Sequence, residues 1–209
     1  MAFSFYELDF DEMQLIVLAS TSDYRRNLLN RLCIPFRNHK PVCDETPRPL
    51  ETAQELVMRL SHEKAKSIQS HFLDALIIGS DQVAEIDGQI VGKPDSHMTA
   101  VRQLSQASGR SVSFKTGLCV YNAATGAMQV DCINVQAQFR ALKRKQIEAY
   151  LSTEQPYDCC GSFKSEGLGI TLVRGVESSD PTALIGLPLI RLTEMLSEEG
   201  IELPLKPAL

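Results

Sequence analysis

The residues best suited to chemistry form two groups of opposite charge. Acidic side chains that can bind a divalent cation or accept a proton are Asp44, Glu45 and Asp81. Basic side chains that can neutralise phosphate oxygens are Arg25, Lys64 and Lys93. Carboxylates usually hold Mg²⁺ together with water and substrate phosphates, and cations stabilise charge on phosphate oxygens. The two groups together supply both requirements of metal-assisted phosphate chemistry.

Two adjacent arginines, Arg25 and Arg26, stand at the predicted start of a helix in LASTSDYRRNLLNRL, residues 18–32. A helix N-terminus carries about half a positive charge, so each arginine is disfavoured there by about 0.3 to 1 kcal/mol. A bound anion would offset this cost, and Ser20 with the helix N-terminus forms a cradle for phosphate. For the arginines alone, the solvated face of an amphipathic helix is the simpler interpretation.

Lys64 lies on the apolar face of a second predicted helix, which runs from Glu51 to about Gln69. Apolar residues stand four positions away from it in both directions, at Leu60 and Ile68. One interpretation is that the stem is buried and the ammonium reaches water at the edge of the apolar face. The functional interpretation is that the ammonium points into a cleft.

Two continuous apolar runs predict strands that are buried on both faces. The first is Leu15 to Ala19, and the second ends at Gly79. Ligands of open α/β sheets collect outside the carboxyl ends of strands, so we expect the loops after both runs to face one cleft. Asp81 would lie in the second loop, where a turn-capping aspartate is the simpler interpretation of that residue alone.

The rest of the chain alternates between helical and extended patterns. Further helices are predicted at residues 99–107, 142–152 and 187–200. Paired strands are predicted at residues 111–122 and 128–139, and Asp87-Gly88 predicts a hairpin. Four prolines between positions 35 and 49 predict extended chain and loop. The pattern indicates an α/β fold.

Two glycine-rich segments differ from the common phosphate-binding loops. GQIVGKP, residues 88–94, has three residues between its glycines and a proline where a P-loop has Ser or Thr. GSFKSEGLG, residues 161–169, lacks the G-x-G-x-x-G spacing of a dinucleotide site. Its glycines suit a tight loop that brings Lys164 and Glu166 against a ligand.

Composition limits the possible partners. The chain has 209 residues, 44% of them hydrophobic, which fits one globular domain or one domain of two lobes. The net charge of -5 gives no overall basic field for nucleic acid, and no apolar run approaches the roughly 20 residues that span a bilayer. The acidic N-terminus does not resemble a secretory signal, and six cysteines without a C-x-x-C pair suggest reduced, mostly buried thiols. We therefore expect a cytoplasmic protein that binds neither nucleic acid nor membrane.

Several linked motifs resemble one family. LASTSDYRRNLL, DET, HEKA, IIGSDQV, GKP and GSFKSEGLGITL occur in the order, and at about the separations, found in the Maf family of nucleoside triphosphate pyrophosphatases. The resemblance runs from about Leu15 to Leu196 and implies a single Maf-like domain, residues 1–209, with an N-terminal extension at 1–14. It implies a fold similar to that of inosine triphosphate pyrophosphatases: a long mixed, curved sheet with flanking helices, and two lobes around a cleft.

The resemblance also implies an activity. Such proteins cleave a nucleoside triphosphate between the α and β phosphates with a divalent metal cation, Mg²⁺ or Mn²⁺, and release pyrophosphate. By this resemblance Asp81 is the proton-accepting catalytic residue, and the metal is held by Glu45 and Asp81. The substrate-binding residues that contact the phosphates correspond to Ser20, Arg25, Lys64 and Lys93. A homodimer is an open alternative to a monomer.

Three further positions decide which base this family accepts, and here they are Tyr24, Gln82 and Glu166. They match the subfamily that acts on 7-methyl-GTP, a modified nucleotide that would be removed before incorporation into nucleic acid. A pocket for this cationic base should combine an aromatic face, a carboxylate and no competing cation. Gln82 would read the base edge with its amide donor and acceptor. The alternatives are a dTTP/UTP pyrophosphatase, or a nucleotide-binding regulator of septum formation.

Overall fold

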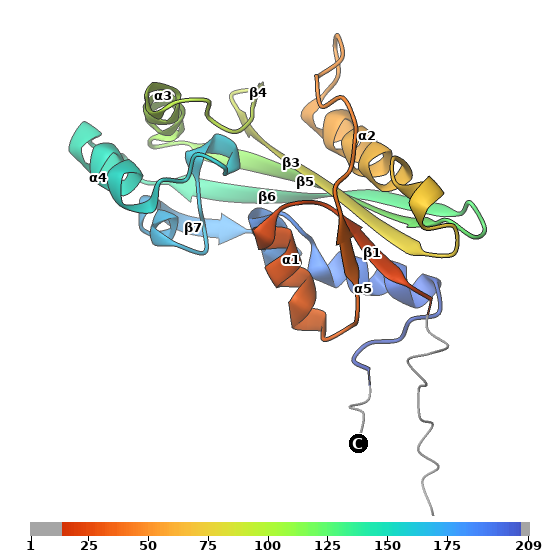
Figure 1. The fold of residues 1–209 in the computed structure, drawn as a ribbon. Helices are drawn as coiled ribbons and strands as arrows, with labels where there is room; N and C mark the ends of the chain where they lie inside the picture. The colour runs from red at the N-terminus through yellow and green to blue at the C-terminus, as the bar shows by residue number, and fades with distance from the viewer. Residues whose placement is uncertain (1–13, 206–209) are drawn as a thin grey trace, which may run out of the picture.

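The computed structural model describes residues 14–205, which form one twisted sheet with helices against both of its faces (Figure 1). Apart from Gln14, the predicted N-terminal extension lies outside the described residues. The strands are β1 Ile16–Ala19, β2 Arg37–His39, β3 Leu76–Ile86, β4 Gln89–Val91, β5 Ser111–Asn122, β6 Met128–Phe139 and β7 Val173–Glu177. The α-helices are α1 Asp23–Leu29, α2 Ala53–Lys66, α3 His97–Ala107, α4 Arg144–Glu154 and α5 Leu189–Glu198. Short 3-10 helices lie at Asn30–Leu32, Gln69–His71, Cys160–Ser162, Leu168–Leu172 and Pro181–Ile185.

The sheet is mixed, as expected for the predicted fold class. Its strand order is β2-β1-β3-β5-β6-β7, and β4 pairs with β3 off this path. β1 pairs in parallel with β2 and β3, whereas the pairs β3/β5, β5/β6 and β6/β7 are antiparallel. The predicted α/β class with a long mixed sheet and flanking helices is confirmed.

β3 is longer than the sequence indicated, and the prediction that it ends at Gly79 is wrong. The strand continues through Asp81 to Ile86 because β5 pairs with it from Leu76 to Glu85, including Asp81 opposite Gly117. Asp81 therefore lies within a strand and does not cap a turn. Pairing with a long neighbouring strand stabilises polar residues in extended conformation more strongly than their own propensity opposes it.

Side chains of β3 alternate between two environments, as the period of a strand requires. Asp81 points toward α2, where Lys64 Nζ donates to its carboxylate. Ser80 and Gln82 point to the opposite face, where their side chains donate to main-chain carbonyls of residues 183–186. The alternation directs the carboxylate of Asp81 to one face of the sheet.

α2 lies unusually close to the sheet, and two glycines make this possible. A Cβ atom at Gly79 would lie 2.0 Å from the carbonyl oxygen of Ser61, and one at Gly117 would lie 2.1 Å from that of Val57. Only a residue without a side chain fits at either position. This close approach places Lys64, on α2, over Asp81.

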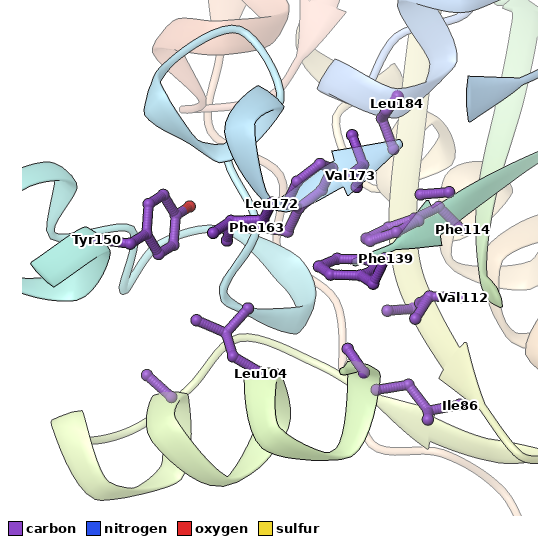
Figure 2. Close-up of a cluster of buried hydrophobic side chains, with 14 of the residues drawn as sticks. Ile86, Leu104, Val112, Phe114, Phe139, Tyr150, Phe163, Leu172, Val173 and Leu184 are labelled. Carbon is purple, nitrogen blue, oxygen red and sulfur yellow. The ribbon is translucent and has the colours of Figure 1, made fainter. Parts of the chain in front are cut away.

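Two larger groups of buried side chains account for the predicted lobes. In one, Phe163 packs against Phe114 and Phe139, with ring centroids 5.6 and 5.1 Å apart, near α3 and α4 (Figure 2). The other lies between the central strands and the helices α1 and α5, and includes Leu28 and Leu192. Each lobe thus has its own apolar support.

All six cysteines are free, but only Cys119 and Cys160 are buried and Cys33 is exposed, so the expectation of mostly buried thiols is wrong. Among residues 14–205, no helix has the length and apolar character needed to cross a membrane.

Candidate functional site

One cavity of about 990 Å³ is lined by nine of the residues predicted for the site, but not by Asp44 or Lys164. It lies between α1, the segment before α2, the middle of β3, and the loop after α4. The predicted residues that line it are Ser20, Tyr24, Arg25, Glu45, Lys64, Asp81, Gln82, Lys93 and Glu166. The structure therefore brings together side chains that are up to 146 positions apart in the sequence.

Lys64 bridges two carboxylates at one end of the cavity. Its Nζ atom lies 2.5 Å from Asp81 Oδ1 and 2.9 Å from Glu45 Oε1. The side chains of Lys64 and Asp81 are only 7% and 9% exposed, whereas that of Glu45 is 62% exposed. The ammonium thus points into the cavity, and the interpretation that it reaches solvent at the edge of the helix is wrong. A buried charge of this kind requires a partner, because desolvation without one is strongly unfavourable.

The charge state of Glu45 follows from the same contact. Burial opposes ionisation, but the hydrogen bond from Lys64 and the charges of Lys64, Lys93 and Arg25 outweigh it, so the pKa of Glu45 lies below its usual value. Glu45 therefore carries a negative charge at neutral pH. Glu45 contacts Lys64 from a segment without regular secondary structure, whereas Asp81 lies within β3.

The carboxylates fit a divalent cation that is shared with a substrate. Both Glu45 and Asp81 use one oxygen in contact with Lys64. No cluster of three or more His, Cys, Asp or Glu side chains suited to a metal occurs among residues 14–205. Two carboxylates are nevertheless a usual protein contribution for Mg²⁺, because substrate phosphates and water supply its other oxygen ligands. The donor set is therefore suited to such an ion when a phosphorylated ligand is present.

Arg25 is held in place at the same end of the cavity. Its Nε atom donates to the main-chain oxygen of Gly186 at 2.8 Å, and its backbone N–H donates to the capping Ser22 at 3.4 Å. The neighbouring Arg26 instead forms an exposed ion pair with Asp23 at 2.9 Å. Of the two arginines, only Arg25 lines the cavity. The unfavourable free energy of an arginine near the helix N-terminus is thus offset for Arg26 by its ion pair with Asp23. Within residues 14–205, Arg25 has no such ion pair and instead lines the cavity, where an anionic ligand would offset it.

The other end of the cavity carries an aromatic ring and acidic side chains. Tyr24 Oη donates to Asp158 Oδ1 at 3.3 Å, and Glu166 also lines this end. Burial, followed by interactions with Cys159 and Asp158, raises the pKa of Tyr24, so its hydroxyl stays protonated. Lys164 Nζ lies 5.8 Å from the centre of the Tyr24 ring, which makes the expectation of no competing cation wrong. This cation is partly neutralised, because Lys164 also contacts Glu154 at 2.7 Å.

Gln82 is engaged within the protein. Its Nε2 atom donates to Ala183 O at 2.8 Å, Thr116 Oγ1 at 3.0 Å and Leu184 O at 3.1 Å. The expectation that this amide offers both a donor and an acceptor to a base is therefore wrong. Its carbonyl oxygen is the atom left for a ligand contact.

Sequence reasoning missed Asp158 and the segment at residues 183–186. The main-chain oxygens of that segment hold Arg25, Ser80 and Gln82. Carbonyl groups have no residue-type signature, so no sequence signal identified them. Asp158 could have been found from its position three residues before the glycine-rich segment at 161–169.

Comparisons with known proteins identify the family. Residues 15–199 match a family model described as Maf-like protein. The chain belongs to the Maf family. The family resemblance seen in its motifs is confirmed.

Relatives within the Maf family are similar over nearly their whole length. The 7-methyl-GTP pyrophosphatase of Pseudomonas syringae pv. syringae is 54% identical over 92% of this chain and 100% of its own. Proteins of the same name from Alcanivorax borkumensis and Pseudomonas aeruginosa are 52% and 50% identical, over 93% and 90% of this chain and 99% and 98% of their own. Among solved structures, the Staphylococcus aureus Ham1 protein aligns with 62% of this chain and 74% of its own, with 15% identity and a TM-score of 0.46.

Proposed function

We propose that this Maf protein hydrolyses 7-methyl-GTP to 7-methyl-GMP and pyrophosphate, and thereby removes a modified nucleotide before its incorporation into nucleic acid. The observation that carries the proposal is the cavity in which Lys64 bridges Asp81 and Glu45. Relatives that are 50 to 54% identical bear the name of this activity. We place the reaction in the cytoplasm, because six free cysteines suit a reducing compartment.

In the proposed reaction Asp81 accepts a proton from the attacking water. The water oxygen bonds to the α phosphorus, and the bond to the bridging oxygen breaks, so that pyrophosphate leaves. Asp81 is suited to this role because it is an almost buried carboxylate on a rigid strand. Lys64, Lys93 and Arg25 would stabilise negative charge on the phosphates, and Arg25 is already oriented by Gly186 O.

We further propose that Glu45 and Asp81 hold a divalent cation, Mg²⁺ or Mn²⁺, together with the substrate phosphates. When bound, the ion supplies positive charge to the phosphate oxygens. Lys64 contacts one oxygen of each carboxylate, which leaves the second oxygen of each for the ion.

The base is proposed to bind at the end of the cavity that carries Tyr24, Asp158 and Glu166. Methylation at N7 gives guanine a positive charge, and a cation against an aromatic ring is favourable by about 0.5 to 2 kcal/mol. Carboxylates at the same end add an attraction that neutral bases lack. Because Lys164 lies over the Tyr24 ring, the base would use the part of the ring that Lys164 leaves open.

The test is pyrophosphate release from a panel of triphosphates, with Mg²⁺, with Mn²⁺ and with a chelator. We expect the highest kcat/KM for 7-methyl-GTP and loss of turnover with the chelator. A preference for dTTP or UTP would instead favour the other pyrophosphatase branch. Nucleotide binding without turnover of any triphosphate would favour a regulator of septum formation.

A further inference from the structure

Glu45 reaches the cavity from a segment without regular secondary structure. Residues 40–52 form neither helix nor strand, and Val42 and Leu50 on this segment are 80% and 100% exposed. Segments of this kind open easily, because few buried contacts hold them. A carboxylate that must stay beside Lys64 therefore needs an anchor on the body of the protein.

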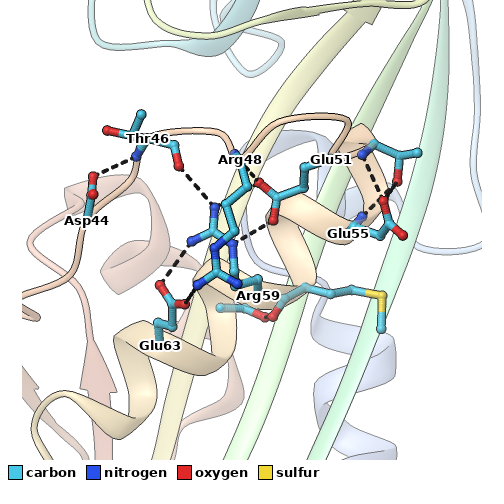
Figure 3. Close-up of polar contacts among 10 residues, drawn as sticks. Asp44, Thr46, Arg48, Glu51, Glu55, Arg59 and Glu63 are labelled. Atoms are coloured by element: carbon cyan, nitrogen blue, oxygen red, sulfur yellow. Dashed lines mark hydrogen bonds and ion pairs between the residues drawn. The ribbon is translucent and has the colours of Figure 1, made fainter.

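Arg59 of α2 contacts this segment at Glu51 and Thr46, and contacts its own helix at Glu63 (Figure 3). Its Nε and Nη2 atoms lie 2.6 and 2.9 Å from the two carboxylate oxygens of Glu51. Nη1 donates to Glu63 at 3.0 Å, and Nη2 also donates to the main-chain oxygen of Thr46 at 3.2 Å. The side chains of Arg59 and Glu51 are only 12% and 8% exposed, so this is not an ordinary surface ion pair.

The contact with Thr46 acts directly next to Glu45. The backbone N–H of Thr46 donates to Asp44 Oδ1 at 2.9 Å, while its carbonyl oxygen accepts from Arg59. The peptide groups that follow Glu45 are thus fixed on both the donor and the acceptor side. Arg59 lies five residues before Lys64 on α2. The same helix therefore holds the backbone at Thr46 through Arg59 and binds the carboxylate of Glu45 through Lys64.

Glu51 closes the segment at its other end. It accepts the bidentate contact from Arg59 and, through Oε2, the backbone N–H of Arg48 at 2.9 Å. The hydrogen bond from Arg59 is the largest of the causes that hold the pKa of Glu51 at about 2, so the pair is charged at neutral pH. Bidentate pairs of an arginine with a carboxylate add geometric precision as well as energy.

Arg59 is not required to begin the helix. Thr52 and Glu55 form a complete capping box, in which Thr52 Oγ1 accepts from Glu55 N at 3.2 Å and Glu55 Oε2 accepts from Thr52 N at 2.9 Å. The N-terminus of α2 is therefore satisfied by its own side chains. Three of the four contacts of Arg59 go to Glu51 and Thr46 in the segment before the helix, and the fourth goes to Glu63 of α2.

We propose that Arg59 is a positioning residue that holds Glu45 beside Lys64 and Asp81 by fixing Thr46 and Glu51. The effect of Arg59 on turnover rests on the proposed pyrophosphatase function. Its effect on the position of residues 42–48 concerns the protein without nucleotide and is independent of any substrate.

The first experiment measures hydrogen–deuterium exchange of the full chain without nucleotide. Arg59→Gln should accelerate exchange in peptides that cover residues 42–48, while peptides from the rest of α2 exchange as in the unsubstituted protein. Glu51→Gln should accelerate exchange in the same peptides, because it removes the charge that pairs with Arg59. Arg144→Gln is the matched control, since Arg144 forms an exposed ion pair with Glu148 on α4. Unchanged exchange at residues 42–48 in both Arg59→Gln and Glu51→Gln would overturn the proposal.

The second experiment is a double-mutant cycle on hydrolysis of 7-methyl-GTP. Arg59→Gln should lower kcat about 10- to 100-fold, as expected when a side chain that orients a ligand-binding group is removed, with a much smaller change in KM. Arg59→Lys should recover little of the lost kcat, because an ammonium cannot form the bidentate contact with Glu51. In a Glu45→Gln background, Arg59→Gln should cause no further loss, since it acts through Glu45.

Full additivity in this cycle would overturn the positioning role, as would unaltered kcat in Arg59→Gln. If the unsubstituted protein hydrolyses no triphosphate, the proposed function fails, and the exchange measurement still decides whether Arg59 anchors the segment. The two failures are therefore distinguishable.

Discussion

At the scale of single residues, Asp81 combines near-complete burial with a direct ion pair to Lys64. Asp81→Asn should fold but lose nearly all turnover, because an amide keeps the shape of the side chain and removes its basicity and its charge. Lys64 would retain Glu45 as a partner, so unfolding should become easier by less than the roughly 3 to 5 kcal/mol of a buried pair that is broken outright. Pyrophosphate release and chemical unfolding measure the two quantities. Retained turnover would remove Asp81 from the mechanism.

Replacing Lys64 has a different consequence from replacing Asp81, because it leaves the carboxylates of Asp81 and Glu45 without the cation that they share. Lys64→Met fills the apolar part of the site with a similar stem, so its effect reports on the charge. We expect loss of turnover together with a pH-dependent loss of stability. Against the effect of burial, the hydrogen bond and the charge of Lys64 lower the pKa of Glu45, so this contact stabilises the fold above the usual pKa of a glutamate and the contribution is lost as the pH falls. The variant should therefore lose more stability at about pH 7 than at about pH 4. Thermal unfolding at both values measures this, and Arg144→Gln serves as the control. An equal loss at both pH values would show that Lys64 does not stabilise the charged form of Glu45.

The nine residues predicted for the site could be found from sequence because their types suit phosphate chemistry and their motifs match one family. Their contacts could not be found in this way. Gln82 has the composition of a base-reading amide, yet its nitrogen is used by Ala183, Leu184 and Thr116. Such contacts depend on residues that are far apart in the chain and meet only in the fold.

At the scale of elements, the bounds of β5 and β6 and the starts of the helices to within two residues could be predicted, but the end of β3 could not. Thr52 and Glu55 form the capping box that begins α2, within two residues of the predicted start. β3 extends seven residues beyond its predicted end because β5 pairs with it as far as Glu85. Capping is a local interaction, whereas pairing between β3 and β5 joins distant parts of the sequence.

The approach of α2 to the sheet gives a prediction for Gly117. Gly117→Ala would place a Cβ atom 2.1 Å from the backbone oxygen of Val57, which cannot move without displacing the helix. Overpacking usually lowers stability by about 1 to 3 kcal/mol, and here it also shifts the helix that carries Lys64. We therefore expect lower thermal stability and lower kcat. Gly175→Ala is the matched control on another strand, since its Cβ atom would come no closer than 3.7 Å to the side chain of Gln138. Equal stability of the two variants would contradict the close approach.

At the scale of the whole molecule, the chain has a net charge of -5, yet three cationic side chains line its cavity: Arg25, Lys64 and Lys93. These three side chains are accompanied by Asp81 and Glu45, whereas the side chains near Tyr24 are Asp158, Glu166 and Lys164. The α/β class could be predicted from alternating patterns along the chain. The strand order could not, because it depends on which distant strands pair.

The carboxylates near Tyr24 lead to a prediction of base selectivity. Tyr24 comes from α1 and Glu166 from the loop after α4, so the base would be held between distant segments. Tyr24→Arg combined with Glu166→Gln removes an aromatic face and a negative charge, and adds a cation beside Asp158. Loss of a cation–π contact of about 0.5 to 2 kcal/mol corresponds to about 2- to 30-fold, before the change in charge is added.

We expect kcat/KM for 7-methyl-GTP to fall by more than about tenfold in this double variant, because repulsion of the cationic base adds to the lost contact. Hydrolysis of dTTP or UTP should stay equal or improve, since Ser20, Arg25, Lys64 and Lys93 are untouched. The ratio of the two rates within one preparation corrects for any loss of folded protein, so the comparison isolates the base. Equal losses on every triphosphate would mean that Tyr24 and Glu166 support the fold or the phosphates. The charge at their end of the cavity would then have no part in the choice of substrate.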